Sequence, residues 1–228
     1  ATACFICTPG GYCPRGAVAP RLCEAGSYSG ASGNANASDC VDCPAGRRNT
    51  DPGTAAALHA DPSCEPGPAG MYSDAIGSSD LSSWVVCPAG RYSPPDRDDV
   101  SDRCLPCRAG RFNADNGTDN RTDATLHAEC EVCSVGLYAA QAGSVECSAC
   151  ASGKYLPYDS KTSDQEHDQE TDCIPCSPGR VSAAGSASCT ECGPGTFANM
   201  TASSCESCTS GTYSSTSGAS ACQPCSPG

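Results

Sequence analysis

The sequence contains few of the large apolar side chains from which hydrophobic cores are built. Its 228 residues include three Phe, two Met and one Trp, and aromatic residues make up 5%. Without such side chains, a chain of this length cannot bury enough apolar surface for an ordinary globular core. No stretch approaches the roughly 20 apolar residues of a membrane-spanning helix. We therefore expect no membrane segment in this chain.

Basic residues are also scarce. The net charge is −13, and Lys154 and Lys161 are the two lysines of the chain. Such a surface repels a phosphate backbone, which makes nucleic acid a poor partner.

Cysteine is the abundant residue, with 22 copies beside 24 Gly and 18 Pro. This cysteine content is typical of a disulfide scaffold, and stable disulfides need an oxidising compartment. Four N-glycosylation sequons lie between cysteines, at Asn36, Asn116, Asn120 and Asn199. We expect an extracellular or cell-surface glycoprotein with N-glycans and no other cofactor. Ser/Thr-rich loops such as 210–220 are candidates for O-glycans.

The cysteines belong to a repeat with the pattern Cys-x-x-Gly-x-aromatic, usually ended by a Cys-x-x-Cys pair that closes one unit and opens the next. The glycine indicates a turn with positive φ, or a close approach of the backbone to the cystine. The aromatic residue is the large apolar group of the unit, and we expect its ring to pack on a neighbouring disulfide. Nine of the twelve aromatic residues occupy this position: Tyr12, Tyr28, Tyr72, Tyr92, Phe112, Tyr138, Tyr155, Phe197 and Tyr213.

One unit has lost both of its cysteines. Gly67 stands in place of the opening cysteine, and Trp84 stands in place of the closing one. If the opening cysteine of each unit bonds the closing one, this paired change deletes one disulfide without an orphan, and the Trp ring fills the space. At the start of the chain Pro20 occupies the closing position, so Cys7 is paired with Cys13. The predicted pairs are Cys7–Cys13, Cys23–Cys40, Cys43–Cys64, Cys87–Cys104, Cys107–Cys130, Cys133–Cys147, Cys150–Cys173, Cys176–Cys189, Cys192–Cys205 and Cys208–Cys222.

Two cysteines remain, one near each end. Cys4 has the position of a closing cysteine of a preceding unit, and Cys225 has that of the opening cysteine of a following unit. We expect either that the chain is cut from a longer array or that copies join head to tail through these two residues. In both cases the partners are neighbouring repeats or copies of the chain.

Zinc is the main alternative for Cys-x-x-Cys pairs. The unit without cysteines argues against it, because Cys64 and Cys87 would be left as two ligands without partners. A redox Cys-x-x-Cys needs a βαβ context that is absent. Oxygen-rich runs at 96–99 and 115–119 lack the final Glu of a calcium-binding loop. We therefore expect no metal site.

The histidines do not form a catalytic pattern. His59 and His127 lie in the similar runs Ala-Leu-His-Ala and Thr-Leu-His-Ala, which indicates duplicated loop sequence, while His167 lies in a different run. No Ser-His-Asp order, paired carboxylates or phosphate loop stands out. We expect no catalytic residue and no enzyme.

The repeat predicts a fold class of small disulfide-rich repeats. We expect an elongated linear stack, a rod, of about eleven short units with no convincing helix and only short β-bridges. The predicted divisions are a partial unit at 1–22, two cystine units at 23–63, the unit without its own disulfide at 64–87, longer-loop units at 87–173, short compact units at 174–225 and the start of a next unit at 226–228.

The Cys-x-x-Gly-x-aromatic unit with its Cys-x-x-Cys pair resembles the ephrin-receptor-like cysteine-rich repeats. It is also similar to the first half-module of tumour-necrosis-factor-receptor cysteine-rich domains. The resemblance covers nearly the whole chain and implies extended, disulfide-laddered rods in receptors and in tandem arrays on surface proteins of protists and algae. The chain departs from the receptor pattern because its units have two cysteines each and lack nested domains with three bridges.

Two functions are compatible with these features. The first is a structural repeat segment of a surface filament, flagellar hair or cell-wall rod. The second is the ligand-binding ectodomain of a receptor or adhesin, which should expose aromatic or Arg anchors. The candidate contact patch is Met71, Ile76, Leu81 and Trp84. We favour the view that this cluster replaces the lost cystine internally.

Overall fold

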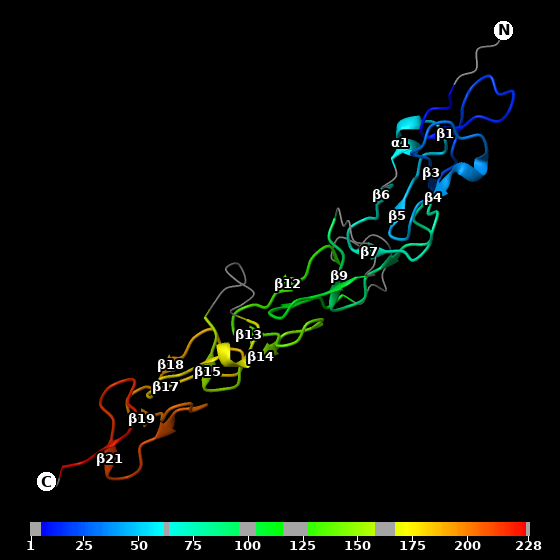
Figure 1. The fold of residues 1–228 in the computed structure, drawn as a ribbon. Helices are drawn as coiled ribbons and strands as arrows, with labels where there is room; N and C mark the ends of the chain where they lie inside the picture. Colours follow the sequence, from blue (N-terminus) through cyan, green and yellow to red (C-terminus); the bar gives the residue numbers. More distant parts are fainter. Residues whose placement is uncertain (1–5, 62–63, 96–103, 116–126, 158–166, 227–228) are drawn as a thin grey trace. The chain divides into compact units, whose positions relative to one another are not determined.

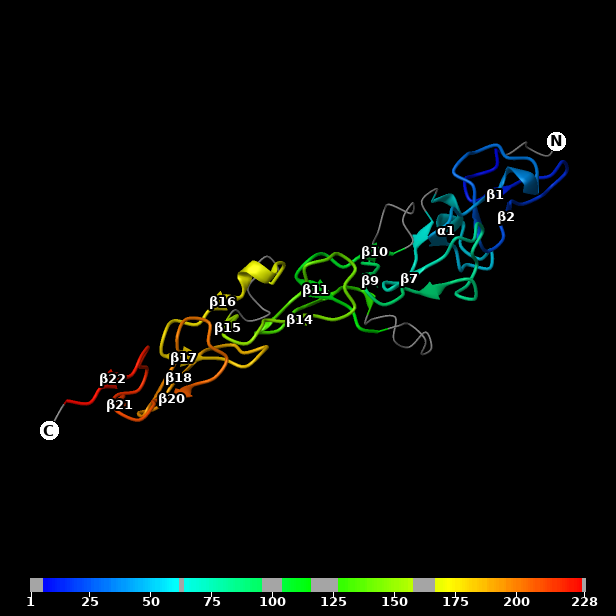
Figure 2. The same cartoon turned by 90° about the horizontal axis from the view of Figure 1, so that it is seen from below.

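The computed structural model describes residues 6–61, 64–95, 104–115, 127–157 and 167–226. Within these ranges the chain forms eleven small sheets of two strands each (Figures 1 and 2). In the ten pairs with a defined register, the strands run antiparallel. The pairs are β1 (Gly11–Tyr12) with β2 (Arg21–Leu22), β3 (Ser27–Tyr28) with β4 (Val41–Asp42), β5 (Arg47–Arg48) with β6 (Glu65–Pro66), β7 (Met71–Tyr72) with β8 (Val85–Val86), β9 (Arg91–Tyr92) with β10 (Leu105–Pro106), β11 (Arg111–Phe112) with β12 (Glu131–Val132), β13 (Leu137–Tyr138) with β14 (Ser148–Ala149), β15 (Lys154–Tyr155) with β16 (Ile174–Pro175), β17 (Arg180–Val181) with β18 (Thr190–Glu191), β19 (Thr196–Phe197) with β20 (Glu206–Ser207), and β21 (Thr212–Tyr213) with β22 (Gln223–Pro224).

The sheets follow the sequence repeat. If the opening cysteine is position one, the glycine is position four, the aromatic residue is position six and the residue after it is position seven. Positions five and six form the first strand of each sheet. The two residues between a closing cysteine and the next opening cysteine form the second strand, as where Tyr28 pairs with Val41. The predicted class of small disulfide-rich units is confirmed.

The chain divides into two compact parts. The first part is Ala1–Leu105 with Asp115–Glu129, and the second is Pro106–Ala114 with Cys130–Gly228. The repeat and its sheets occur in both parts, so each part is built by the same local rule.

Disulfides form the core of the units. The structure contains ten bridges, and they join the same ten pairs that the repeat rule proposes. Most of the buried apolar residues are half-cystines, and the opening cysteines from Cys23 to Cys192 are at most 1% exposed. The cystines therefore take the place of the large apolar side chains that the sequence lacks.

The motif glycine forms the predicted turn. The eleven position-four glycines within the described residues all have a positive φ, between 73° and 92°. This region of φ favours glycine because a Cβ atom is strained there. The prediction of a positive-φ turn is confirmed.

Short helices are present where the sequence predicted none. We attribute α1 (Ala56–Ala60) to its Ala-rich composition, which favours helix, and to Asp51, whose carboxylate accepts hydrogen bonds from the N–H groups of Thr54 and Ala55 just before the helix. No helix in the described ranges is both long and apolar enough to cross a membrane. The helices that lie wholly within the described residues are α1 (Ala56–Ala60) and the 3-10 helices η1 (Ala37–Asp39) and η4 (Glu170–Asp172).

Candidate functional site: the joints between repeat units

Consecutive units are joined by backbone hydrogen bonds at the motif glycine. The N–H of Gly26 donates to the position-seven carbonyl of the next unit, Asn49, at 2.8 Å, and the Gly26 carbonyl accepts from the N–H of Cys43, also at 2.8 Å. We call this pair of bonds the joint. The same two bonds recur at Gly10, Gly46, Gly70, Gly110, Gly136, Gly153, Gly179 and Gly195.

The residue at position seven is buried beside the joint, and the sequence analysis did not identify it as a contact residue. This residue is at most 9% exposed in ten units. In nine of these units the position-seven carbonyl accepts from the motif glycine of the preceding unit, while the side chain packs inward, which explains why Ser, Asn and Ala dominate there. The repeated small residue after the aromatic position was the available signal. The residues are Ser29, Asn49, Ser73, Ser93, Asn113, Ala139, Leu156, Ser182, Ala198 and Ser214.

The glycine is also required by a close contact. A Cβ atom on Gly26 would lie 2.2 Å from the carbonyl oxygen of Gly77, and one on Gly179 would lie 2.0 Å from that of Gly218. Both contacts come from a loop two units farther along the chain. The predicted close approach therefore exists, but the neighbour is loop backbone and not the cystine.

In units with short loops, a glycine and the residue after it form two further hydrogen bonds with the preceding unit. The N–H of Gly77 donates to the Cys43 carbonyl at 2.8 Å, and the next carbonyl, of Ser78, accepts from the N–H of Asn49 at 3.1 Å. Each pair thus binds positions one and seven of the preceding unit. The equivalent pairs are 33–34, 143–144, 185–186 and 218–219.

In three units with long loops, a histidine makes the additional contact with the preceding unit. His59, His127 and His167 lie in the units 43–64, 107–130 and 150–173, and each is 0% exposed. Their backbone carbonyls accept from the position-seven N–H groups of Ser29, Ser93 and Ala139, respectively, at 2.7–2.9 Å. The interpretation of His59 and His127 as duplicated loop sequence is incomplete, because His167 has the same place.

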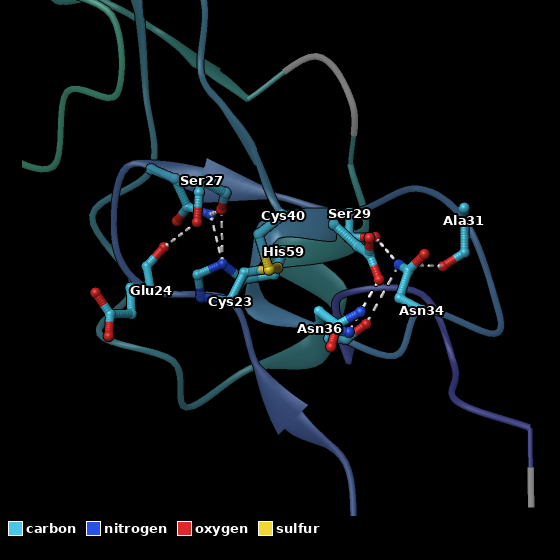
Figure 3. Close-up of a disulfide and its surroundings, with 12 residues drawn as sticks. Cys23, Glu24, Ser27, Ser29, Ala31, Asn34, Asn36, Cys40 and His59 are labelled. Atoms are coloured by element: carbon cyan, nitrogen blue, oxygen red, sulfur yellow. Dashed lines mark hydrogen bonds between the residues drawn. A yellow bond between two sulfur atoms is a disulfide. The ribbon is translucent and has the colours of Figure 1, made fainter. Parts of the chain in front are cut away.

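Each histidine ring contacts the same strand of the preceding unit. The Nδ1 atoms of His59, His127 and His167 lie 2.9, 3.4 and 2.7 Å from the position-five carbonyl oxygens. These carbonyls belong to Ser27, Arg91 and Leu137. Figure 3 shows His59 beside the Cys23–Cys40 disulfide of that unit. The ring and the backbone of each histidine together attach a long loop to its neighbour.

Carboxylates face two of these rings. Nε2 of His59 lies 3.4 Å from Oδ2 of Asp51, and Nε2 of His127 lies 3.4 Å from Oδ2 of Asp115. The pKa of Asp51 is lowered, first by the hydrogen bond from the Thr54 hydroxyl and further by the N–H groups of Thr54 and Ala55 and the charge of His59, against the opposing effect of burial. The Asp51 carboxylate is therefore held in its ionised form.

Trp84 replaces the missing disulfide from inside the unit. Met71 and Trp84 are 4% and 5% exposed and form a small cluster against which Leu81 and Val86 pack. The Trp84 ring covers Gly67, where a Cβ atom would lie 1.9 Å from Cζ3 of the indole. The candidate contact patch is thus not a set of exposed anchors, because its two largest members are buried and only Ile76 is strongly exposed.

The aromatic residues at position six are half-buried, apart from Tyr213, which is 45% exposed. Tyr138 shows the expected packing on a disulfide, since it contacts the cluster of Cys150, Leu156 and Cys173 in the next unit. Exposure of these rings places them at the rim of each unit, while the cystine and position seven form its centre.

The remaining predicted residues have separate environments. Asn36, at the start of η1, and Asn199 are exposed. Cys225 is a free, exposed cysteine whose N–H donates to the Gly211 carbonyl at 2.9 Å, as the opening cysteines do in the joints. In the described ranges no group of three or more His, Cys, Asp or Glu side chains is placed to hold a metal ion. Outside the described residues lie Cys4, Asn116, Asn120 and the runs 96–99 and 116–119.

Comparison with known proteins addresses the repeat. A family model described as "Tyrosine-protein kinase ephrin type A/B receptor-like" matches residues 122–166 and 195–228. These two segments match ephrin-receptor-like cysteine-rich repeats. The resemblance predicted from the motif is confirmed. No curated protein matches the chain. The ephrin-receptor-like match and the ten disulfides indicate an extracellular, secreted or surface protein.

Proposed function

We propose that the chain is a structural repeat segment of an extracellular glycoprotein, such as a surface filament, flagellar hair or cell-wall rod. The observation that carries this proposal is the joint, which recurs with the same two backbone bonds in both compact parts. Because the joint uses backbone groups, loops and side chains can vary while units still stack. In this function the partners are neighbouring repeats or copies of the chain, and the chain is neither an enzyme nor dependent on a cofactor.

Glycans belong to the same proposal. Asn36 and Asn199 are exposed and lie in sequons, so an oligosaccharide at either residue requires no unfolding of a unit. We expect Asn36→Gln and Asn199→Gln each to remove one glycan from secreted protein. Intact mass before and after peptide glycosidase treatment measures this, and an unchanged mass would remove glycosylation from the proposal.

Electron microscopy of native material tests the structural function directly. Negative-stain images should show periodic filaments that contain the chain, identified by a specific antibody. Dispersed particles that capture a soluble protein would contradict the proposal and support the receptor function instead.

A ligand-binding ectodomain is the second candidate, and the receptor-like description of the matching family favours it. Binding interfaces depend on exposed aromatic or Arg anchors. Burial of Met71 and Trp84 removes the strongest anchors that the sequence offered. We therefore rank this function second.

A further inference from the structure

The three joint histidines differ in what faces the second ring nitrogen. In each, Nδ1 lies against a backbone carbonyl, which can only accept, so Nδ1 carries a proton. Nδ2 of Asn49 also lies 3.0 Å from Nδ1 of His59, but the two hydrogens of this amide can both be donated to the Ser27 and Leu58 carbonyls, at 3.1 and 3.2 Å. The charge of each ring is therefore decided at Nε2.

At His59 and His127, Nε2 faces a carboxylate. The His59 and Asp51 side chains are 0% and 4% exposed, and the His127 and Asp115 side chains are 0% and 23% exposed. With a proton on Nε2, the ring is a cation beside an anion. Without this proton, the nitrogen lone pair points at the carboxylate, and a buried charge loses its counterion.

Other titratable groups around His59 are few. Helix α1 packs against β1 and β3, which carry Tyr12 and Tyr28, and Glu24 lies at the turn before β3. Among the described residues, the carboxylate at ion-pair distance from the His59 ring is that of Asp51.

Around His127 and His167 the strands contribute other charged groups. Beside His127, β9 carries Arg91, whose guanidinium donates to the Cys104 carbonyl at 2.7 Å, and Tyr92, while Glu129 follows in the loop. Near His167 are Tyr138 on β13, Asp168, and Glu170, which pairs with Lys154 at 3.7 Å. Among the described residues, Nε2 of His167 makes no hydrogen bond, and neither does Nε2 of His59; the difference is that a carboxylate lies at ion-pair distance from His59.

We propose that His59 and His127 are proton-dependent clamps that hold their long loops on the preceding units. Histidine changes charge between about pH 5 and 8. On the acidic side Nε2 is protonated, the ion pair with Asp51 or Asp115 is complete and the loop is held. As the pH rises and this proton leaves, the attachment weakens. His167 provides an internal control, because the described structure shows no carboxylate paired with its ring.

Amide hydrogen exchange of the full chain tests the clamps. The N–H groups of Ser29, Ser93 and Ala139 bond to the three histidine carbonyls, so their protection factors report each loop separately. Between about pH 5 and 8 we expect the protection of Ser29 and Ser93 to fall about tenfold, a scale set by the attraction within one ion pair, while that of Ala139 stays constant. An equal change at all three residues would overturn the proposal.

A variant connects the effect to the carboxylate. Asp51→Asn should abolish the pH dependence at Ser29 and leave that at Ser93, whereas Glu65→Gln, at an exposed carboxylate of β6, should change neither. If Asp51→Asn disturbs folding, the ring ¹⁵N shifts of His59 in the unaltered protein still decide. Two protonated nitrogens at acidic pH and one at alkaline pH support the clamp; a neutral ring throughout contradicts it.

Discussion

Gly67 and Trp84 occupy the places of two cysteines and are separated by as many residues as Cys23–Cys40 and Cys87–Cys104, each with a separation of 17. In the cystine units a covalent bond closes the loop and is itself the core. In the 67–84 unit an indole ring lies on the glycine and packs with Met71.

The joints on both sides of this unit are nevertheless the same. Gly46 donates to the Ser73 carbonyl at 2.9 Å, and Gly70 donates to the Ser93 carbonyl at 2.7 Å, as in the cystine units. The comparison shows that the disulfide closes a unit but does not create the contact between units. A well-packed Trp can therefore substitute for it.

The largest expected effect is the loss of the Trp core. Trp84→Ala should lower the free energy of unfolding by about 3–5 kcal/mol, because it empties the centre of a unit that has no disulfide. Guanidinium unfolding without reductant measures this. The control is Val85→Ala, whose side chain is 53% exposed and should cost about 0.5 kcal/mol or less. Equal effects of the two substitutions would show that the ring does not replace the cystine.

The contact shared by both kinds of unit gives the next effect. Gly26→Ala, beneath the loop of the 67–84 unit, and Gly179→Ala, beneath that of a cystine unit, should each destabilise by about 2–4 kcal/mol through backbone strain and overlap with a carbonyl.

Substitutions of two other glycines distinguish backbone strain from overlap with a carbonyl in the same unfolding experiment. Gly211→Ala keeps the strain of φ +85° without a neighbour within 4 Å and should cost less, while Gly193→Ala has neither and should be nearly neutral. A cost at Gly193 equal to that at Gly179 would refute the close-contact explanation.

Restoring the cysteines should nearly cancel in free energy. The double change Gly67→Cys with Trp84→Cys should form a disulfide, detected by a mass two hydrogens lower than that of the reduced form. The bond contributes about 2–4 kcal/mol and the lost ring costs about 3–5 kcal/mol, so the net change should lie between about 3 kcal/mol less stable and about 1 kcal/mol more stable. Free thiols in folded protein would show that the two residues are not in cystine positions.

Loop length among the cystine units should have the smallest effect. Replacing both cysteines of 107–130, with a separation of 23, should cost about 0.5 kcal/mol more than replacing those of 176–189, with a separation of 13. Paired Cys→Ala variants unfolded side by side measure the difference. A larger cost for the short unit would mean that packing outweighs chain entropy.

Local features of the repeat could be predicted because each is repeated within every unit. The turn at position four, the pairing of opening with closing cysteines and the substitution of Trp84 for a cystine all follow from comparing units along the chain. The absence of helix was predicted wrongly at α1, where the Asp51 carboxylate and an Ala-rich run outweigh the general loop composition.

The joint histidines could not be found in this way. They lie at different distances from the closing cysteine of their units, since His59, His127 and His167 precede Cys64, Cys130 and Cys173 by 5, 3 and 6 residues. Their loops differ in sequence, so no fixed spacing links them. Only the position that each ring reaches on the preceding unit is shared.

By itself, the sequence determined the pairing of the cysteines, the glycine turn and the resemblance to ephrin-receptor-like repeats, because these depend on residues close together in the chain. The tertiary structure decided the burial of position seven, the close approach of loop backbone to Gly26 and Gly179, and the equivalence of the three histidines. Those features arise from contacts between units, where backbone groups meet. Backbone groups are common to every residue, so the sequence alone does not reveal which of them will pair.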